Sequence, residues 1–156
     1  MRIFVDTEFI EDGKTIDLIS IGLVREDGNH VYLISNEFDE SKASDWVRIN
    51  VLSKITANEL ANAVSRATIA EVILRFAGES PEFWGYYADY DWVAICQLYG
   101  TMMQLPNGWP MFCMDLKQEA VRRGVCLPKQ PPGQHRAIDD AFWVKHAYET
   151  MVDVAK

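Results

Sequence analysis

Three apolar segments open the chain, and short polar turns separate them. The first segment, "MRIFVDTEFI", is rich in residues that favour strands, as are "TIDLISIGLV" and "HVYLISNEF". The turns "EDGK" and "EDGN" each contain a glycine. Because short turns between consecutive strands favour antiparallel pairing, the pattern predicts an antiparallel meander of three strands, over residues 1–10, 15–24 and 30–38.

Beyond residue 40 the apolar positions adopt helical spacing, interrupted by two short segments that are typical of strands. One segment, "EFWGYYA", is strongly aromatic, and the other is "PMFCM". The predicted helices cover residues 41–55, 68–78, 89–100, 115–124 and 137–154, and the predicted strands cover 82–88 and 110–114. We therefore expect an α/β fold with a mixed five-stranded sheet flanked by helices.

Two adjacent aspartates begin the last predicted helix, and the helical period separates them. Asp140 falls in line with Val144, Ala147 and Met151, which form an apolar stripe, whereas Asp139 falls on a mostly polar face. A carboxylate that faces a core is costly unless it is paired or binds a metal ion. Asp140 is therefore the candidate functional residue, and Asp139 is expected to be solvated.

The first predicted strand carries a second pair of acids, Asp6 and Glu8. They are two residues apart, so their side chains leave the same face of the strand. A shared cation would relieve their mutual repulsion, and oxygen ligands of this kind suit Mg²⁺ or Mn²⁺. The alternative is a pair of solvated acids on an edge strand, and the spacing alone does not separate the two interpretations.

Asp91 is the remaining candidate acid. Its neighbours at helical spacing are Ala94, Ile95 and Leu98, so this acid also faces an apolar side of its helix. Asp89 nearby is interpreted as the N-cap of that helix. Taken alone, Asp91 is also compatible with a capping role, and only the group of core-facing acids favours a shared site.

Composition narrows the function classes. The 156 residues are 49% apolar and fit one globular domain, residues 1–156. A net charge of −8 and a pI of about 4.8 argue against binding nucleic acid through a broad basic stripe, but not against an acidic site that carries metal ions. Acids interrupt the N-terminal apolar run, no segment is long enough to span a membrane, and the three cysteines form no CxxC pair. We therefore expect a soluble, cytoplasmic protein with reduced thiols.

Three motifs resemble those of the DEDDh class of 3′→5′ exonucleases, which belongs to the ribonuclease H-like superfamily. They are "DTE" on the first strand, "YDWVAICQL" in the middle and "HRAIDDA" at the start of the last helix. The residues that match the class pattern are Asp6 with Glu8, Asp91 after Tyr90, and His135 with Asp140. The motifs occur in the class order over nearly the whole chain, which looks most like a small stand-alone bacterial 3′→5′ exoribonuclease.

The resemblance implies a ribonuclease H-like fold and hydrolysis of single-stranded RNA, or of a 3′ overhang, to nucleoside 5′-monophosphates. It implies two divalent cations, Mg²⁺ or Mn²⁺, held by Asp6, Glu8, Asp91 and Asp140. His135 would be the general base, and the Pro/Gly-rich loop 127–134 would let it move over the substrate.

Substrate and partner contacts follow from the same resemblance. Expected substrate contacts are Thr7, Phe9 and Tyr90, whereas core packing is expected for Trp84, Tyr86, Trp92 and Trp143. Relatives in this class often form dimers, so a homodimer is expected. Two alternatives stay open: an exonuclease of the same class that acts on DNA, because metal ions act on phosphates and not sugars, and a non-catalytic nucleic-acid-binding module.

Overall fold

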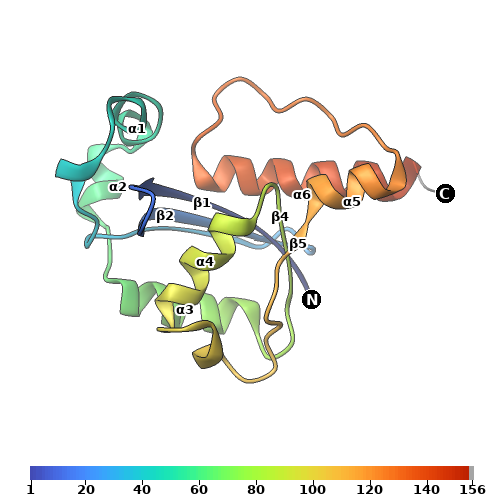
Figure 1. Cartoon of the computed structure of the whole chain (residues 1–156), viewed down its shortest axis with the longest axis horizontal. Coiled ribbons are helices and arrows are strands. Elements are labelled where there is room, and N and C mark those ends of the chain that lie inside the picture. Colours follow the sequence, from blue (N-terminus) through green and yellow to red (C-terminus); the bar gives the residue numbers. More distant parts are fainter. Residues whose placement is uncertain (155–156) are drawn as a thin grey trace.

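The computed structural model describes residues 1–154, and a five-stranded mixed sheet forms its centre (Figure 1). The strand order is β3-β2-β1-β4-β5. The first three strands pair antiparallel, whereas β4 pairs parallel with β1 and β5 pairs parallel with β4. The bounds are β1 Arg2–Glu11, β2 Ile16–Arg25, β3 His30–Ile34, β4 Glu82–Gly85 and β5 Met114–Asp115. The predicted meander and the mixed sheet are therefore confirmed.

Helices cover both faces of this sheet. Figure 1 shows α6 with α5 on one side of the sheet and α3 with α4 on the other, whereas α1 and α2 lie near the end of β1. The bounds are α1 Asp45–Asn50, α2 Ala57–Ala61, α3 Arg66–Ala77, α4 Asp89–Leu98, α5 Leu116–Arg123 and α6 Ala137–Val154, with 3₁₀ turns at Glu40–Lys42, Leu52–Lys54 and Met102–Gln104. None of the helices in residues 1–154 has the length and hydropathy that a bilayer-spanning helix requires.

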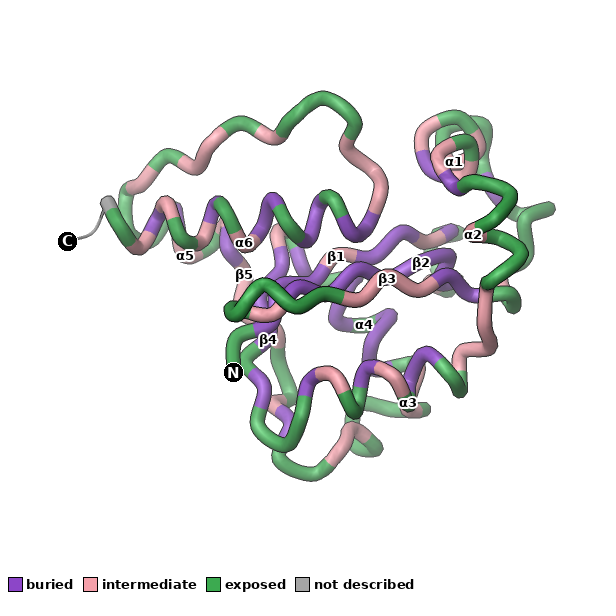
Figure 2. The backbone as a smooth tube through the Cα atoms, turned by 180° about the vertical axis from the view of Figure 1, so that it is seen from behind, coloured by how far each residue is buried: buried purple, intermediate pink, exposed green. Residues whose placement is uncertain are grey.

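Alternation along the central strands divides the core into two layers, because successive side chains leave opposite faces of a strand. Phe4 and Val24 pack toward α6, whereas Ile3, Val5 and Leu23 pack toward α3 and α4. Figure 2 shows the buried positions concentrated in the central strands and on the inner sides of the helices. The odd and even positions of β1 therefore face different helices.

Several predicted element boundaries were wrong, and among them the third strand, predicted over 30–38, ends at Ile34. The helix predicted over residues 41–55 is broken, because Ser44 caps a helix that begins only at Asp45, and 3₁₀ turns flank this helix. The strand predicted over 82–88 ends at Gly85, since Tyr87 adopts a left-handed φ of 56° that a strand does not permit. The strand predicted over 110–114 is only the two-residue β5.

Candidate active site

Three carboxylates converge at the carboxyl-terminal half of β1. Asp6 and Glu8 leave β1 on the face that α6 covers, and Asp140 comes from the first turns of α6. One oxygen from each of the three carboxylates lies within 4.8 Å of the others. Glu8 and Asp140 are only 8% and 7% exposed, and Asp6 is half-buried. The three acids therefore lie together because Asp6 and Glu8 share one face of β1 and Asp140 lies on the face of α6 that packs against it.

The backbone just before α6 holds Asp140 in place. Its Oδ2 accepts hydrogen bonds from the amide of His135, at 2.6 Å, and from the amide of Arg136, at 3.3 Å. These amides precede the helix and have no partner inside it, so Asp140 satisfies donors that the start of a helix leaves free. The spacing of five residues in "HRAIDDA" thus has a structural meaning: Asp140 folds back onto the backbone that carries His135. Asp139, as predicted, is exposed.

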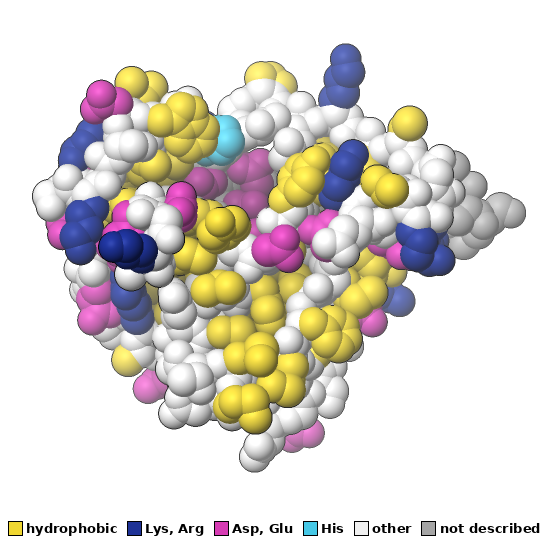
Figure 3. Space-filling model, viewed as in Figure 1, with side chains coloured by type: hydrophobic (Ala, Val, Ile, Leu, Met, Phe, Trp, Pro, Cys, Tyr) yellow, Lys and Arg dark blue, Asp and Glu magenta, His cyan; other side chains and the backbone are white. Residues whose placement is uncertain are grey.

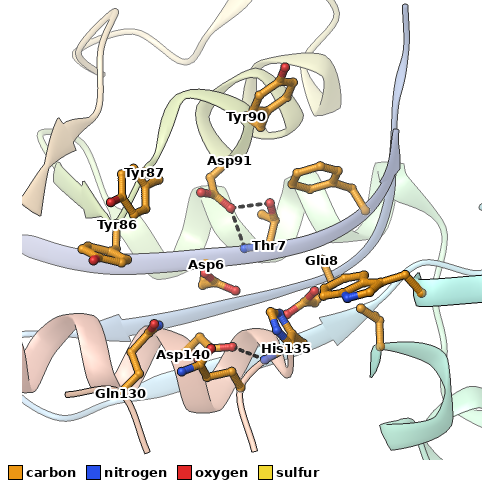
Figure 4. Close-up of a pocket in the computed structure, with 14 residues that line it drawn as sticks. Asp6, Thr7, Glu8, Tyr86, Tyr87, Tyr90, Asp91, Gln130, His135 and Asp140 are labelled. Atoms are coloured by element: carbon orange, nitrogen blue, oxygen red, sulfur yellow. Dashed lines mark hydrogen bonds between the residues drawn. The ribbon is translucent and has the colours of Figure 1, made fainter. Parts of the chain in front are cut away.

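Asp91 reaches the site from the opposite layer. Its Oδ1 accepts hydrogen bonds from the amide of Thr7 at 2.7 Å and from the hydroxyl of Thr7 at 2.5 Å. In Figure 4, Asp91 and α4 lie on one side of β1, and Asp6, Asp140 and His135 lie on the other. Asp91 is therefore outside the group of three close carboxylates, although it lines the same pocket.

The start of α4 differs from the prediction. Asp89 is the first residue of the helix and not its N-cap, which is Ala88. The backbone amide of Ala88 donates a hydrogen bond to the side chain of Asp115, which also caps α5. The start of α4, and with it Asp91, is therefore fixed by an acid from β5.

Burial and mutual repulsion raise the pKa values of these carboxyls. The pKa of Asp6 is well above its ordinary value, first because of desolvation and then because of the charges of Asp91, Glu8 and Asp140. Desolvation and the charges of Asp140 and Asp91 raise the pKa of Glu8 to about 8, against a smaller lowering by Lys54. The cluster thus resists full ionisation unless a positive charge enters it.

Hydrogen bonds oppose this effect at the other two acids. Desolvation raises the pKa of Asp91 to about 6, although both hydrogen bonds from Thr7 lower it. Desolvation also raises the pKa of Asp140, against the hydrogen bonds from the amides of His135 and Arg136. These two acids are therefore more easily ionised than burial alone would allow.

The acids form the floor of a pocket of about 370 Å³, open to solvent. Figure 3 shows acidic side chains at the bottom of a hollow that hydrophobic side chains border. All eight residues singled out from the sequence line it: Asp6, Thr7, Glu8, Phe9, Tyr90, Asp91, His135 and Asp140. The buried hydroxyl of Thr7 is engaged by Asp91, whereas Phe9 stacks on Tyr90 with ring centroids 5.8 Å apart.

Sequence reasoning missed several residues of the pocket wall. They are Trp46, Val51, Tyr86, Tyr87, Gln130 and Gln134. Trp46 is 53% exposed and its ring meets the ring of His135 edge-on, with centroids 4.7 Å apart. Trp84, Trp92 and Trp143 are buried as predicted. Tyr86 packs against the core as expected, but it is only half-buried and also lines the pocket. The aromatic run "FWGYYA" was the available signal, because it continues beyond the short strand β4.

Solved structures that resemble this chain in fold include exonucleases. The chain resembles exonuclease I from Methylocaldum szegediense with a TM-score of 0.65 at 14% identity, and it spans 40% of the length of that protein. It also resembles exonuclease X in complex with 5′ overhanging duplex DNA, with a TM-score of 0.55 at 18% identity over 99% of this chain and 93% of that one. The fold is therefore that of the ribonuclease H-like exonucleases, as predicted.

The sequence comparisons identify the branch. The model of the family described as "3'-5' exoribonuclease Rv2179c-like domain" matches residues 1–152. A relative from Mycobacterium tuberculosis (strain H37Rv), the 3′-5′ exoribonuclease Rv2179c, is 45% identical over 146 residues, which are 90% of this chain and 87% of the mycobacterial protein. This chain belongs to the Rv2179c-like family of 3′-5′ exoribonuclease domains, and the predicted enzyme class is confirmed.

Proposed function

We propose that residues 1–156 form one metal-dependent exonuclease domain. It removes nucleoside 5′-monophosphates from the 3′ end of single-stranded RNA or of a 3′ overhang. The observation that carries the proposal is the convergence of Asp6, Glu8 and Asp140 within 4.8 Å at the floor of an open pocket. Membership of an exoribonuclease family supports RNA as the substrate.

The donor set fits divalent cations. The three close side chains offer carboxylate oxygens, the ligands that Mg²⁺ and Mn²⁺ favour, and their raised pKa values reflect a concentration of negative charge that cations would neutralise. The direct ligands would be Asp6, Glu8 and Asp140. Asp91 lines the same pocket and would add a fourth negative charge near the cations. Two bound cations would supply activation of a water molecule and neutralisation of charge on the phosphate and the leaving oxygen.

His135 is the proposed general base. Its side chain lines the pocket beside the acids, and an imidazole can accept a proton near neutral pH. As water attacks the phosphorus of the last phosphodiester, His135 accepts a proton from the water and the bond from phosphorus to the 3′ oxygen of the preceding nucleotide breaks. The released 3′ oxygen takes a proton from solvent. The products are a nucleoside 5′-monophosphate and an RNA with a new 3′ hydroxyl.

The aromatic wall suits the terminal bases. Phe9 and Tyr90 stack on each other on one side, and Trp46 stands beside His135. Exposed aromatic rings hold single-stranded bases by stacking, at about 1–3 kcal/mol for each base. With Thr7 at the pocket floor, these residues would position the 3′-terminal nucleotide. An aromatic wall grips bases without a basic stripe, which agrees with the net charge of −8.

The direct test compares two adjacent aspartates. Asp140→Asn should abolish release of nucleotides from a labelled RNA oligonucleotide and weaken Mn²⁺ binding in calorimetry. Asp139→Asn is the matched control, because Asp139 lies one residue away on the same helix but is exposed. Equal activity and equal Mn²⁺ affinity in the two variants would rule out the proposed site. Retention of Mn²⁺ binding without any hydrolysis in the wild-type protein would instead favour the non-catalytic binding module.

RNA and DNA are distinguished by a second assay. Matched single-stranded RNA and DNA oligonucleotides of one sequence differ in the 2′-hydroxyl that lets a protein tell them apart. Faster shortening of the RNA supports the proposal, and faster shortening of the DNA assigns the chain to the alternative, a deoxyribonuclease. The family favours RNA, whereas exonuclease X, a relative in fold alone, was solved with duplex DNA.

We also propose that the protein is a cytoplasmic homodimer. The resemblance to dimeric relatives motivates the dimer, and three unpaired cysteines agree with a reducing compartment. Light scattering should give twice the mass of 17.8 kDa, and cell fractionation should recover the protein with cytoplasmic markers. A monomeric mass would exclude the dimer.

A further inference from the structure

The residues on both sides of His135 are tied to one neighbouring segment. The Nζ of Lys54 donates a hydrogen bond to the carbonyl of Gln134. The guanidinium of Arg136 donates to Oε1 of Glu59 at 2.6 Å. Lys54 ends a 3₁₀ turn and Glu59 lies in α2, so both contacts come from the segment of residues 52–61 that follows α1.

The backbone of His135 needs such support. Its φ of 73° lies in the left-handed region, which is unfavourable for a residue that carries a Cβ. Within the described structure, residues 125–136 form neither helix nor strand. Because no ladder of hydrogen bonds holds this loop, the conformation of His135 depends on single contacts. The amides of His135 and Arg136 donate to Asp140, and Lys54 and Glu59 bind the groups on either side of His135.

We propose that Lys54 and Glu59 are positioning residues that clamp residues 134–136 and thereby hold His135 over the carboxylates. This inference rests on the proposed role of His135 as the base. It modifies the expectation of a freely moving loop: the loop is tied down immediately before and after the catalytic side chain. Neither contact involves the imidazole, so the clamp acts on the backbone and leaves the ring free to meet water.

Lys54 is the more informative half of the clamp. Arg136 keeps other contacts if Glu59 is lost, because its guanidinium also lies over the ring of Tyr32, 4.9 Å from the centroid, and pairs with Asp139. Glu59 in addition forms a capping box with Thr56, so its replacement also disturbs α2. Lys54 is half-buried, and its Nζ donates hydrogen bonds to the carbonyls of Gly133 and Gln134. Its replacement therefore tests the clamp with little effect on the fold.

A double-mutant cycle separates the positioning role of Lys54 from two other ways in which this lysine could affect the rate. The charge of Lys54 also lowers the pKa of Glu8, and a lysine at a nuclease site can contact phosphate directly. If Lys54 acts through His135, Lys54→Met should lower kcat about 10- to 100-fold with little change in KM. In the His135→Ala background the same substitution should cause no further loss. Lys54→Arg, which keeps a cationic donor, should restore most of the rate.

The outcomes are distinct. An undiminished kcat in Lys54→Met overturns the clamp. An equal loss of kcat in the wild-type and His135→Ala backgrounds also overturns it, because Lys54 would then act on Glu8 or on the RNA and not through His135. Lys42→Met is the control, since Lys42 is an exposed lysine of the preceding 3₁₀ turn. Failure of the underlying function shows separately, as undiminished hydrolysis by His135→Ala alone. Thermal melting of each variant establishes that it is folded before rates are compared.

Discussion

Gly22 lies directly opposite Asp6 in the β1–β2 ladder, and its missing side chain leaves the space that the start of α6 occupies. A Cβ at this position would lie 2.4 Å from the carbonyl oxygen of Ala137 and 2.5 Å from the Cα of Ile138. Both contacts are with backbone, so the helix itself would have to move. The distance between Asp6 on β1 and Asp140 on α6 therefore depends on a glycine that belongs to neither element.

Replacement of this glycine should damage the site more than the fold. Gly22→Ala forces the start of α6 outward, and overpacking of this kind costs about 1–3 kcal/mol of unfolding free energy. We expect Mn²⁺ affinity, measured by calorimetry, to fall at least tenfold because Asp140 leaves its partners (a factor of ten is about 1.4 kcal/mol). Val24→Ala on the same face of β2 should lose comparable stability through a cavity yet keep its Mn²⁺ affinity. Equal affinities in the two variants would contradict the spacing role of Gly22.

The stability of the metal-free protein should fall as pH rises. The folded-state pKa of Glu8 is about 8 and that of Asp6 is also raised, whereas the carboxyls of an unfolded chain titrate at about 4. The folded protein therefore binds these protons more tightly than the unfolded chain does. The resulting stabilisation is complete below the unfolded pKa and is lost as pH rises through the folded pKa. Thermal denaturation in EDTA should give a lower Tm at pH 8 than at pH 5.

Two further measurements identify the carboxylate cluster as the cause of the decrease in Tm with pH. Glu8→Gln removes one of the titrating groups, so the decrease in Tm between pH 5 and pH 8 should become smaller. Addition of Mn²⁺ at pH 8 should raise the Tm of the wild-type protein, because the cation binds the ionised carboxylates of the folded state. A Tm that rises between pH 5 and pH 8 in EDTA, with no response to Glu8→Gln, would refute this account.

Loss of the Thr7 hydroxyl should change how Asp91 titrates. Thr7→Val removes the hydrogen bond of 2.5 Å to Asp91 but leaves the one from the amide. Because both hydrogen bonds lower the pKa of Asp91, the pKa should rise, and the acid limb of the pH–rate profile should move to higher pH. The free energy of unfolding should fall by about 1.5–3 kcal/mol, as is usual for a hydrogen bond to a charged group. Thr15→Val is the control, because it removes a hydrogen bond from a threonine hydroxyl to a carboxylate, Asp12, in an exposed turn. It should leave the pH–rate profile unchanged and cost less stability, since water replaces an exposed hydrogen bond.

Exposed Trp46 should contribute to substrate binding. Trp46→Ala removes a ring that lines the pocket, and the loss of one stacked base contact is worth about 1–3 kcal/mol. We expect KM for an RNA oligonucleotide to rise about tenfold, with a smaller change in kcat. Ile49→Ala is the matched control, because Ile49 is exposed on the same short helix but does not line the pocket. An unchanged KM in Trp46→Ala would show that the ring only packs against His135.

The parts of the site that follow from local periodicity were predictable from sequence. The helical period separated Asp140 from Asp139, and the strand period put Asp6 and Glu8 on one face, because both facts depend only on neighbouring residues. The hydrogen bond from Thr7 to Asp91 joins residues 84 positions apart, and no local pattern reports it. The position of Trp46 likewise depends on where α1 begins, which a cap at Ser44 decides against the apolar pattern.

Unusual backbone conformations were the second feature that could not be predicted from the sequence. Tyr87 and His135 both have positive φ, and neither is a glycine or an asparagine that would have signalled a left-handed turn. The strand predicted through Tyr87 therefore ran too far, and the support that His135 receives from Lys54 was not visible. Such residues adopt their conformations because distant contacts impose them, so only the folded structure reveals them.

The carboxylate cluster combines the first strand with the last helix. During translation, Asp6 and Glu8 leave the ribosome well before Asp140, because α6 follows every strand of the sheet. A nascent chain that has not yet reached α6 lacks one of the three converging acids. An enzyme made on an RNA template thus acquires its nuclease centre only after α6 has been synthesised.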